Sequence, residues 1–176
     1  MRQVNWGIVG LGNIAEKFAK AFQFSKNAKL LGIASLDQKK INKFQDKFQI
    51  EEKYCFSSYE KLLSCSDVDI IYIALPNSLH HEWIVKCIEK EKKILVEKPA
   101  TINFFQIKDI QNKLSDKNLL FSEAFMYRFH PQIIKVVELI KDNKIGELIS
   151  LESSFGVDIL TKKNLYGSTY FREICT

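Results

Sequence analysis

The sequence lacks the features that mark a membrane protein, a disulfide scaffold or a repeat protein. No apolar run approaches the length of a membrane-spanning helix. No signal peptide precedes the first apolar segment, and the chain shows no internal repeat or low-complexity linker. The four cysteines (Cys55, Cys65, Cys87 and Cys175) lie far apart without a Cys-x-x-Cys pair, which argues against a zinc site or a disulfide framework. These absences predict a cytoplasmic protein with reduced thiols.

Clustered positive charge is also missing. The net charge is +5, and the lysines are spread along the chain, with only short pairs such as Lys39-Lys40 and Lys92-Lys93. A nucleic-acid-binding protein would concentrate basic residues on one face, so no nucleic-acid partner is expected. His80 and His81 are adjacent and have no third ligand nearby, and neighbouring side chains point in different directions on a helix. No metal site is therefore predicted.

The sequence does contain a regular alternation of short apolar segments with amphipathic ones. Its 176 residues, 46% hydrophobic and 27% charged, suit a globular protein with one full domain. Strands are expected at residues 4–10, 30–35, 54–56, 68–75, 94–96 and 119–122, with helices between them. This alternation predicts an α/β fold with a Rossmann-type, doubly wound parallel sheet. Ligands bind such sheets beyond the carboxyl ends of the strands, so the segments that follow the strands are the candidate site.

The first of these segments carries a Gly-x-Gly-x-x-Ala pattern, formed by Gly10, Gly12 and Ala15. It follows an apolar strand and opens a helix, which is the context of a dinucleotide-binding turn. Gly10 would allow the tight turn, Gly12 would let a pyrophosphate approach the backbone, and Ala15 would let helix and strand pack closely. The anion would then bind N–H groups at the helix N-terminus.

A change of pattern after residue 122 indicates a second domain. Residues 131–141 are expected to form a helix that buries Ile133, Val136, Val137 and Ile140, with Gly146 as its stop signal. Residues 147–155 alternate polar and apolar side chains, as a half-buried antiparallel strand does. We therefore expect a dinucleotide-binding domain over 1–122 and, over 123–176, the first strand of an incomplete α+β domain.

Four segments, in order along the chain, resemble one family. They are Gly10-Leu11-Gly12-Asn13-Ile14-Ala15, Ala74-Leu75-Pro76-Asn77-Ser78-Leu79-His80, Glu97-Lys98-Pro99, and Glu123-Ala124-Phe125-Met126-Tyr127-Arg128-Phe129-His130-Pro131. Together they are similar to the glucose–fructose oxidoreductase/inositol dehydrogenase (Gfo/Idh/MocA) family, and most to its dihydrodiol and xylose dehydrogenase branch. The resemblance covers about residues 3–157.

The resemblance implies an NAD(P)-dependent oxidoreductase that transfers hydride between the nicotinamide and a sugar, polyol or dihydrodiol-type substrate. It also implies a homodimer. The expected cofactor-binding residues are Gly10, Gly12, Asn13 and Ile14 at the pyrophosphate, Leu75, Asn77 and His80 on the ribose and nicotinamide side, and Glu97 at the nicotinamide ribose.

Lys98 is the catalytic residue that the resemblance implies, and it would also contact the substrate. An ammonium beside the reacting carbon would stabilise the negative charge that develops on the substrate oxygen, or help to pass a proton. Pro99 would hold a cis peptide that aims the lysine. Arg128 would border the substrate cleft, although core packing at a domain junction explains the aromatic residues around it equally well.

The end of the second strand bears on the choice of cofactor. An acidic residue there favours NAD and a basic residue favours NADP. Leu36 stands where NADP-using relatives commonly have arginine, whereas Ser35 and Lys39 or Lys40 would suit a phosphate. Asp37 argues for NAD unless it only caps the following helix. The resemblance favours NADP, and NAD remains the alternative.

Two functions remain open from the sequence. The family's acid/base partner would fall at or just beyond the last residue, and neither Tyr166 nor Tyr170 has the matching context. The chain is therefore either an oxidoreductase represented by a truncated sequence, or a dinucleotide-binding fragment or sensing module without catalysis.

Overall fold

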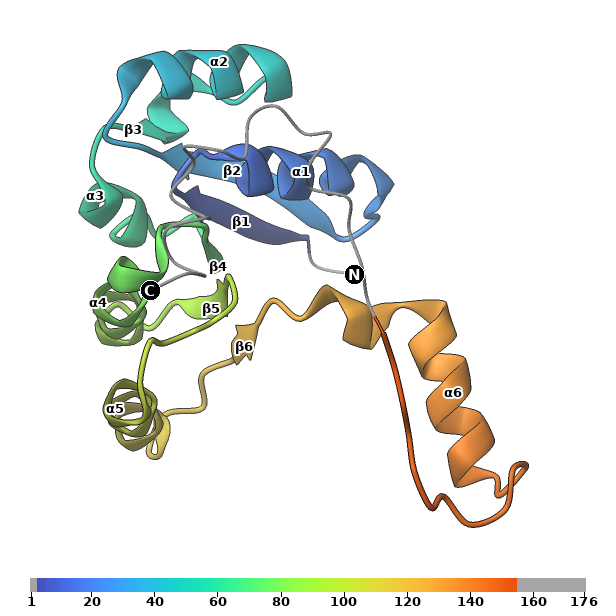
Figure 1. Cartoon of the computed structure of the whole chain (residues 1–176). Helices are drawn as coiled ribbons and strands as arrows, with labels where there is room; N and C mark the ends of the chain where they lie inside the picture. The colour runs from blue at the N-terminus through green and yellow to red at the C-terminus, as the bar shows by residue number, and fades with distance from the viewer. Residues whose placement is uncertain (1–2, 155–176) are drawn as a thin grey trace. The chain divides into compact units, whose positions relative to one another are not determined.

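The computed structural model describes residues 3–154, which fall into two compact units divided after Tyr127. The first unit contains a six-stranded sheet with the order β3-β2-β1-β4-β5-β6 (Figure 1). Its strands are β1 (Val4–Val9), β2 (Ala28–Ala34), β3 (Cys55–Phe56), β4 (Ile70–Ile73), β5 (Lys93–Val96) and β6 (Phe121–Glu123). All neighbouring strands are parallel. The predicted doubly wound sheet is confirmed.

The helices of this unit connect the strands. They are α1 (Asn13–Ala21), α2 (Gln38–Phe48), α3 (Tyr59–Leu63), α4 (Asn77–Glu89) and α5 (Phe104–Leu114), with short 3-10 helices η1 (Phe22–Phe24) and η2 (Glu52–Tyr54). A third 3-10 helix, η3 (Met126–Phe129), follows β6 and includes residues of both units. The side chains of Asp37, Ser58 and Asn103 accept hydrogen bonds from the first amides of α2, α3 and α5. These caps fix where the helices begin, because the first amides of a helix have no partner within it.

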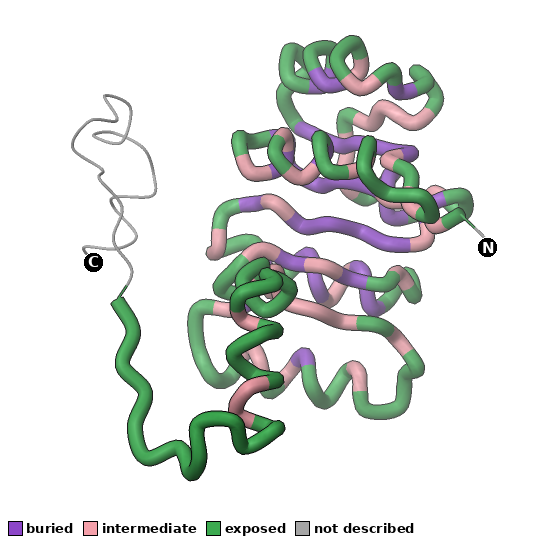
Figure 2. The backbone as a smooth tube through the Cα atoms, turned by 90° about the vertical axis from the view of Figure 1, so that its right-hand side faces the viewer, coloured by how far each residue is buried: buried purple, intermediate pink, exposed green. Residues whose placement is uncertain are grey.

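The sheet is buried on both faces. Successive residues of β4 point to opposite sides, so Ile71 and Ile73 pack with α3, α4 and α5, while Tyr72 packs with α1 and α2. Figure 2 shows the buried residues concentrated along the strands. A parallel sheet needs this double cover, and its strands are accordingly almost continuously apolar.

The second unit is described as far as residue 154. It contains α6 (Pro131–Lys141), whose bounds match the prediction, and the ring of His130 accepts a hydrogen bond from the Gln132 amide at its start. The predicted buried face is wrong for two of its four residues, because Val136 and Val137 are exposed. Ile133 and Ile140 are half-buried. None of the residues of α6 is fully buried.

Two further expectations for this unit need correction. The helix ends at Lys141, and Asn143 takes the left-handed conformation (φ 53°) close after it, so Gly146 (φ 73°) serves a later turn. The strand predicted over residues 147–155 is absent from residues 147–154, and Phe155 lies outside the described residues. Alternation of polar and apolar residues cannot by itself stabilise a strand, because a strand needs a neighbouring strand for its backbone hydrogen bonds.

Gly10, at the end of β1, meets the chain that leaves β4. Its amide donates to the carbonyl oxygen of Ala34 at 3.0 Å, and its φ is +88°. A Cβ added to Gly10 would lie 2.6 Å from the carbonyl oxygen of Ala74. Glycine is therefore required here both by backbone conformation and by space, as the sequence predicted for the tight turn.

We expect Gly10→Ala to lower the free energy of unfolding by about 2 to 4 kcal/mol, because it combines a positive φ with a backbone clash. Urea unfolding would measure the loss. The matched control is Gly12→Ala, since Gly12 has φ −93° and no atom within 4 Å of an added Cβ. Equal stability of the Gly10→Ala and Gly12→Ala proteins would contradict this account.

Candidate functional site

The segments after β1, β2, β4, β5 and β6 lie at one edge of the sheet, because parallel strands point their carboxyl ends the same way. The chain leaves the central strand β1 between its neighbours β2 and β4. Crossovers run in opposite directions from this point, which is where dinucleotides bind in sheets of this order. All predicted site residues except Arg128 belong to these segments of the first unit. Arg128 is the first residue of the second unit.

The turn formed by Gly10, Leu11 and Gly12, called the glycine turn below, leaves the first amides of α1 without a side-chain cap. Gly12 is the N-terminal cap and no side chain caps this end of the helix. Gly12 and Asn13 are exposed, whereas Ile14 is half-buried. The first amides of a helix are suited to bind an anion, so this turn can hold a phosphate group.

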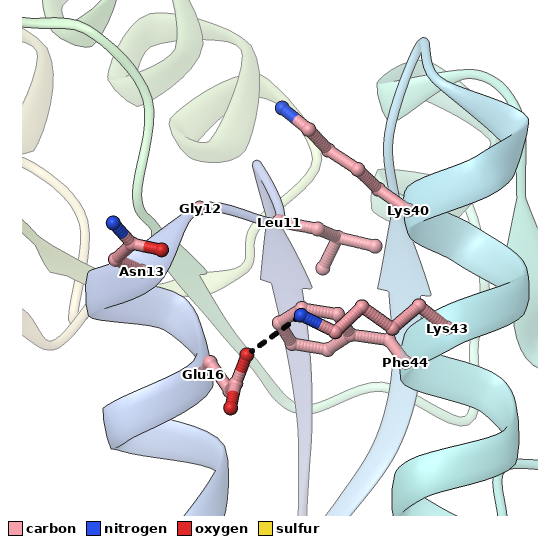
Figure 3. Close-up of a pocket in the computed structure, with 7 residues that line it drawn as sticks. All are labelled: Leu11, Gly12, Asn13, Glu16, Lys40, Lys43 and Phe44. Carbon is pink, nitrogen blue, oxygen red and sulfur yellow. Dashed lines mark hydrogen bonds and ion pairs between the residues drawn. The ribbon is translucent and has the colours of Figure 1, made fainter. Parts of the chain in front are cut away.

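A cavity of about 300 Å³ lies beside the turn (Figure 3). It is lined by Leu11, Gly12, Asn13, Glu16, Lys40, Lys43 and Phe44. It therefore joins the glycine turn and α1 to the first turns of α2. Gly12 and Asn13 were predicted site residues. Glu16, Lys43 and Phe44 were not, although the lysine spacing along α2 is visible in the sequence.

Glu16 is surrounded by lysines. Its carboxylate lies 2.6 Å from the Lys47 ammonium, 3.3 Å from that of Lys43 and 3.5 Å from that of Lys20. The hydrogen bonds from Lys47 and Lys43 lower the pKa of Glu16 to about 2. Glu16 is consequently ionised near neutral pH, and its charge is balanced by α2.

Asp37, close after the end of β2, caps the next helix. Its Oδ1 atom accepts hydrogen bonds from the amides of Lys39 (2.9 Å) and Lys40 (3.4 Å), so Asp37 caps α2. Ser35 is buried, and its hydroxyl oxygen accepts from the Asp37 amide at 3.1 Å. The residue that follows β2 is thus a serine, and the nearby carboxylate is engaged by the backbone of α2.

The loop after β5 carries Glu97 and Lys98. The Tyr72 hydroxyl donates to Glu97 Oε1 at 2.5 Å, and Glu97 Oε2 accepts from the Lys98 amide at 3.3 Å. Burial, and then the hydrogen bond to Glu97, raise the pKa of Tyr72 above its usual range. Tyr72 therefore stays a hydrogen-bond donor that orients the Glu97 carboxylate. Lys98 itself is exposed.

The next residues of this loop are also fixed from neighbouring strands. The Lys98-Pro99 peptide bond is cis, as expected. The Ala100 amide donates to the Glu123 carboxylate at 2.8 Å, at the end of β6. Sequence reasoning assigned no role to Glu123, because its partner is 23 residues away in the chain.

His80 is fully buried behind this loop. Its Nδ1 atom lies 2.7 Å from the Pro99 carbonyl oxygen, and its Nε2 atom lies 2.8 Å from the Leu75 carbonyl oxygen. Both ring nitrogens face backbone oxygens, so the ring has no polar atom left for a cofactor. The ring joins the segment after β4 to the loop after β5. Leu75 is buried and Asn77 begins α4.

Two other kinds of feature are absent from residues 3–154. No group of three or more metal-ligating side chains is close enough to hold an ion there. Within the same residues, no helix is both long and apolar enough to cross a membrane. Cys55, Cys65 and Cys87 are free thiols, and Cys175 lies outside the described residues, as do Tyr166 and Tyr170.

Known proteins similar to this chain include several sugar and diol oxidoreductases. Trans-1,2-dihydrobenzene-1,2-diol dehydrogenase of Xenopus tropicalis is 30% identical over 88% of this chain and 47% of its own length. D-xylose 1-dehydrogenase (NADP(+)) 2 of Haloferax volcanii is 31% identical over 85% of this chain and 45% of its own length. The chain thus spans about half the length of the curated relatives it matches.

Solved structures agree with these relatives. A 3-ketoreductase of Actinomadura kijaniata, solved with TDP-benzene and NADP, is 30% identical with a TM-score of 0.73. The match covers 83% of this chain and 46% of the reductase. Scyllo-inositol dehydrogenase of Lactobacillus casei, solved with NAD(H) and scyllo-inositol, is 25% identical with a TM-score of 0.76, over 83% of this chain and 43% of that one.

The sequence model of the Gfo/Idh/MocA oxidoreductase family, described by its NAD-binding Rossmann fold, matches residues 4–125. With this match over more than half of the 176 residues and the same fold in its solved relatives, the chain belongs to the Gfo/Idh/MocA family of oxidoreductases.

Proposed function

We propose that this chain binds a nicotinamide dinucleotide across the carboxyl edge of its sheet and serves a hydride-transferring oxidoreductase. The observation that carries the proposal is the contrast between two glycines. The fold requires a glycine at position 10, because a side chain there would clash. Gly12 has open space around it and an ordinary backbone conformation, so the fold would accept another residue there. A pyrophosphate lying against the backbone at Gly12 would account for the missing side chain.

The proposed path of the cofactor follows from the strand order. The pyrophosphate lies on the turn at Gly12, Asn13 and Ile14, with the adenosine half toward β2 and the nicotinamide half toward β4 and β5. The nicotinamide side then meets Leu75, Asn77 and Glu97. We assign His80 to positioning the loop after β5, because both of its ring nitrogens contact backbone oxygens.

Lys98 is the proposed catalytic residue. When a hydroxyl is oxidised, a hydride leaves its carbon for the nicotinamide and the hydroxyl proton must also leave. An ammonium beside the oxygen stabilises the negative charge during this transfer in either direction. The loop is suited to hold such a group, because Tyr72, His80 and Glu123 contact Glu97, Pro99 and Ala100 around Lys98.

The proposed substrate is a sugar, a cyclic polyol or a dihydrodiol, the compounds that the names of the relatives specify. The matched regions cover only 47% and 45% of the two curated relatives. Arg128 is proposed to contact the substrate. The homodimer and the cytoplasmic location stay predictions.

Gly12→Val tests the dinucleotide site. A branched side chain against the pyrophosphate should reduce the affinity for NADPH and NADH at least about 100-fold, since it removes the close backbone approach. Titration calorimetry would measure the affinity, and circular dichroism the fold. Gly12→Ala should give a smaller loss. A folded Gly12→Val protein with unchanged affinity for both cofactors would refute the site.

Lys98→Ala tests the catalytic assignment. We expect kcat to fall about 100-fold or more, because a charge-stabilising donor is lost at the reacting oxygen, while cofactor affinity stays within about twofold. The measurement is NADP⁺ reduction with D-xylose or trans-1,2-dihydrobenzene-1,2-diol. Unchanged turnover in the Lys98→Ala protein would show that Lys98 is not the catalytic residue. Cofactor binding without turnover in the wild-type chain would favour the non-catalytic module.

A further inference from the structure

We infer that Tyr72 is a positioning residue of the proposed site, and that it acts by holding the Glu97 carboxylate in place for the nicotinamide ribose. The inference rests on the proposed function, because it concerns the nicotinamide side of the same dinucleotide site. Tyr72 lies within β4 and is only 1% exposed, so it does not itself reach a bound cofactor. Its effect on the site therefore passes through Glu97.

The first step is that β4 holds Glu97 by both its backbone and its side chain. The Glu97 amide donates to the carbonyl oxygen of Ile73 at 3.0 Å, and the hydroxyl of the preceding residue, Tyr72, donates to Glu97 Oε1 at 2.5 Å. The contact from the Lys98 amide to Glu97 Oε2 is longer, at 3.3 Å. Hydrogen bonds to charged groups are strongest when they are short, so Tyr72 makes the stronger of these two contacts with the carboxylate.

The second step is that the ring of Tyr72 is fixed in the core. It packs against Phe18 of α1 with a centroid distance of 4.1 Å. Phe18 in turn contacts the rings of Trp6 at 5.5 Å and Phe22 at 5.3 Å. Strand β4 itself is paired with β1 on one side and β5 on the other. The hydroxyl therefore keeps its place, and the Glu97 side chain is positioned by it.

The third step is that Glu97 keeps acceptor sites for a ligand. Burial, and then the hydrogen bond to Glu97, raise the pKa of Tyr72 above its usual range, so the hydroxyl remains a donor. A carboxylate offers roughly four lone-pair sites on its two oxygens, and Glu97 is half-buried rather than enclosed. A ribose hydroxyl can thus donate to the same carboxylate. Without the Tyr72 hydroxyl, the Glu97 side chain would be free to rotate away from that ribose.

The experiment is a set of calorimetric titrations of the whole 176-residue chain with NADPH, NADH and ADP. Tyr72→Phe keeps the ring and removes only the hydroxyl. We expect it to lower the affinity for NADPH and NADH about 10-fold, as the loss of one charged hydrogen bond would. The affinity for ADP should stay within about twofold, because ADP has no nicotinamide ribose. A general loss of packing would instead weaken all three.

Tyr54→Phe is the matched control. The Tyr54 hydroxyl also donates to a carboxylate, that of Asp67, at 2.7 Å. Asp67 precedes β4, so this hydrogen bond lies at the amino edge of the sheet, away from the proposed site. The Tyr54→Phe protein should bind all three ligands as the wild-type chain does.

Glu97→Ala tests whether Tyr72 acts through Glu97. This substitution removes the same hydrogen bond from the loop, so it should also lower the affinity for NADPH and NADH about 10-fold and spare ADP. Adding Tyr72→Phe to the Glu97→Ala protein should then change each affinity by no more than about twofold, because residues that act as one unit are not additive.

Three results would overturn the inference while the proposed function stands. They are unchanged affinity for NADPH and NADH in either single variant, an equal loss of affinity for ADP, and a further loss of about 10-fold when Tyr72→Phe is added to Glu97→Ala. Binding of neither cofactor by the folded wild-type chain would overturn the proposed function itself.

Discussion

The close approach of two strand ends is the constraint on which the rest of this structure depends. The turn after β1 passes so near the chain after β4 that no side chain fits at Gly10. This contact lets the chain reverse directly into α1, with the first amides of the helix at the carboxyl edge of the sheet. The cavity between α1 and α2 and the loop that carries Lys98 are both placed relative to this turn, because β1 lies between β2 and β4.

Hydrogen bonds between neighbouring strand ends fix the conformation of the loops at the carboxyl edge of the sheet. Loops at such an edge have few apolar contacts of their own, so polar side chains must fix them. Tyr72 combines both functions, since its ring packs against Phe18 of α1 with a centroid distance of 4.1 Å while its hydroxyl holds Glu97. His80 and Glu123 extend the same network to Pro99 and Ala100. Packing of the core and orientation of the candidate catalytic loop are thus physically linked.

The sequence predicted the fold well where local patterns decide the structure. The bounds of α6 agree with the prediction because its apolar spacing begins close after Pro131, a residue that suits the first turn of a helix. Strand ends were less accurate: β4 covers Ile70–Ile73 within a longer apolar run. Buried residues flank a strand as well as form it, so hydrophobicity alone cannot give its limits. The expected strand after Gly146 failed for a different reason, because pairing depends on other segments.

The candidate site was predictable only in part. Motif resemblance found the glycine turn and the loop at Lys98, which are contiguous in sequence. The pairing of Glu16 with Lys43 and Lys47 spans 27 and 31 residues and has no sequence signature. The contacts of His80 go to backbone oxygens, which every residue possesses, so no residue type could have revealed them. The capping of α2 by Asp37 was one of two open interpretations, and the structure shows this cap.

The strand order has a consequence for how this site can change. The segment that would meet the adenosine half of the cofactor lies after β2, on one side of β1, and the loop with Lys98 lies after β5, on the other side. The hydrogen bonds and ion pairs described above connect each region to its own neighbours. Binding of the adenosine half and hydride transfer would therefore depend on different side chains, so exposed positions such as 36, 39 and 40 could be exchanged for another cofactor while Ile41, which packs with Tyr72, is kept.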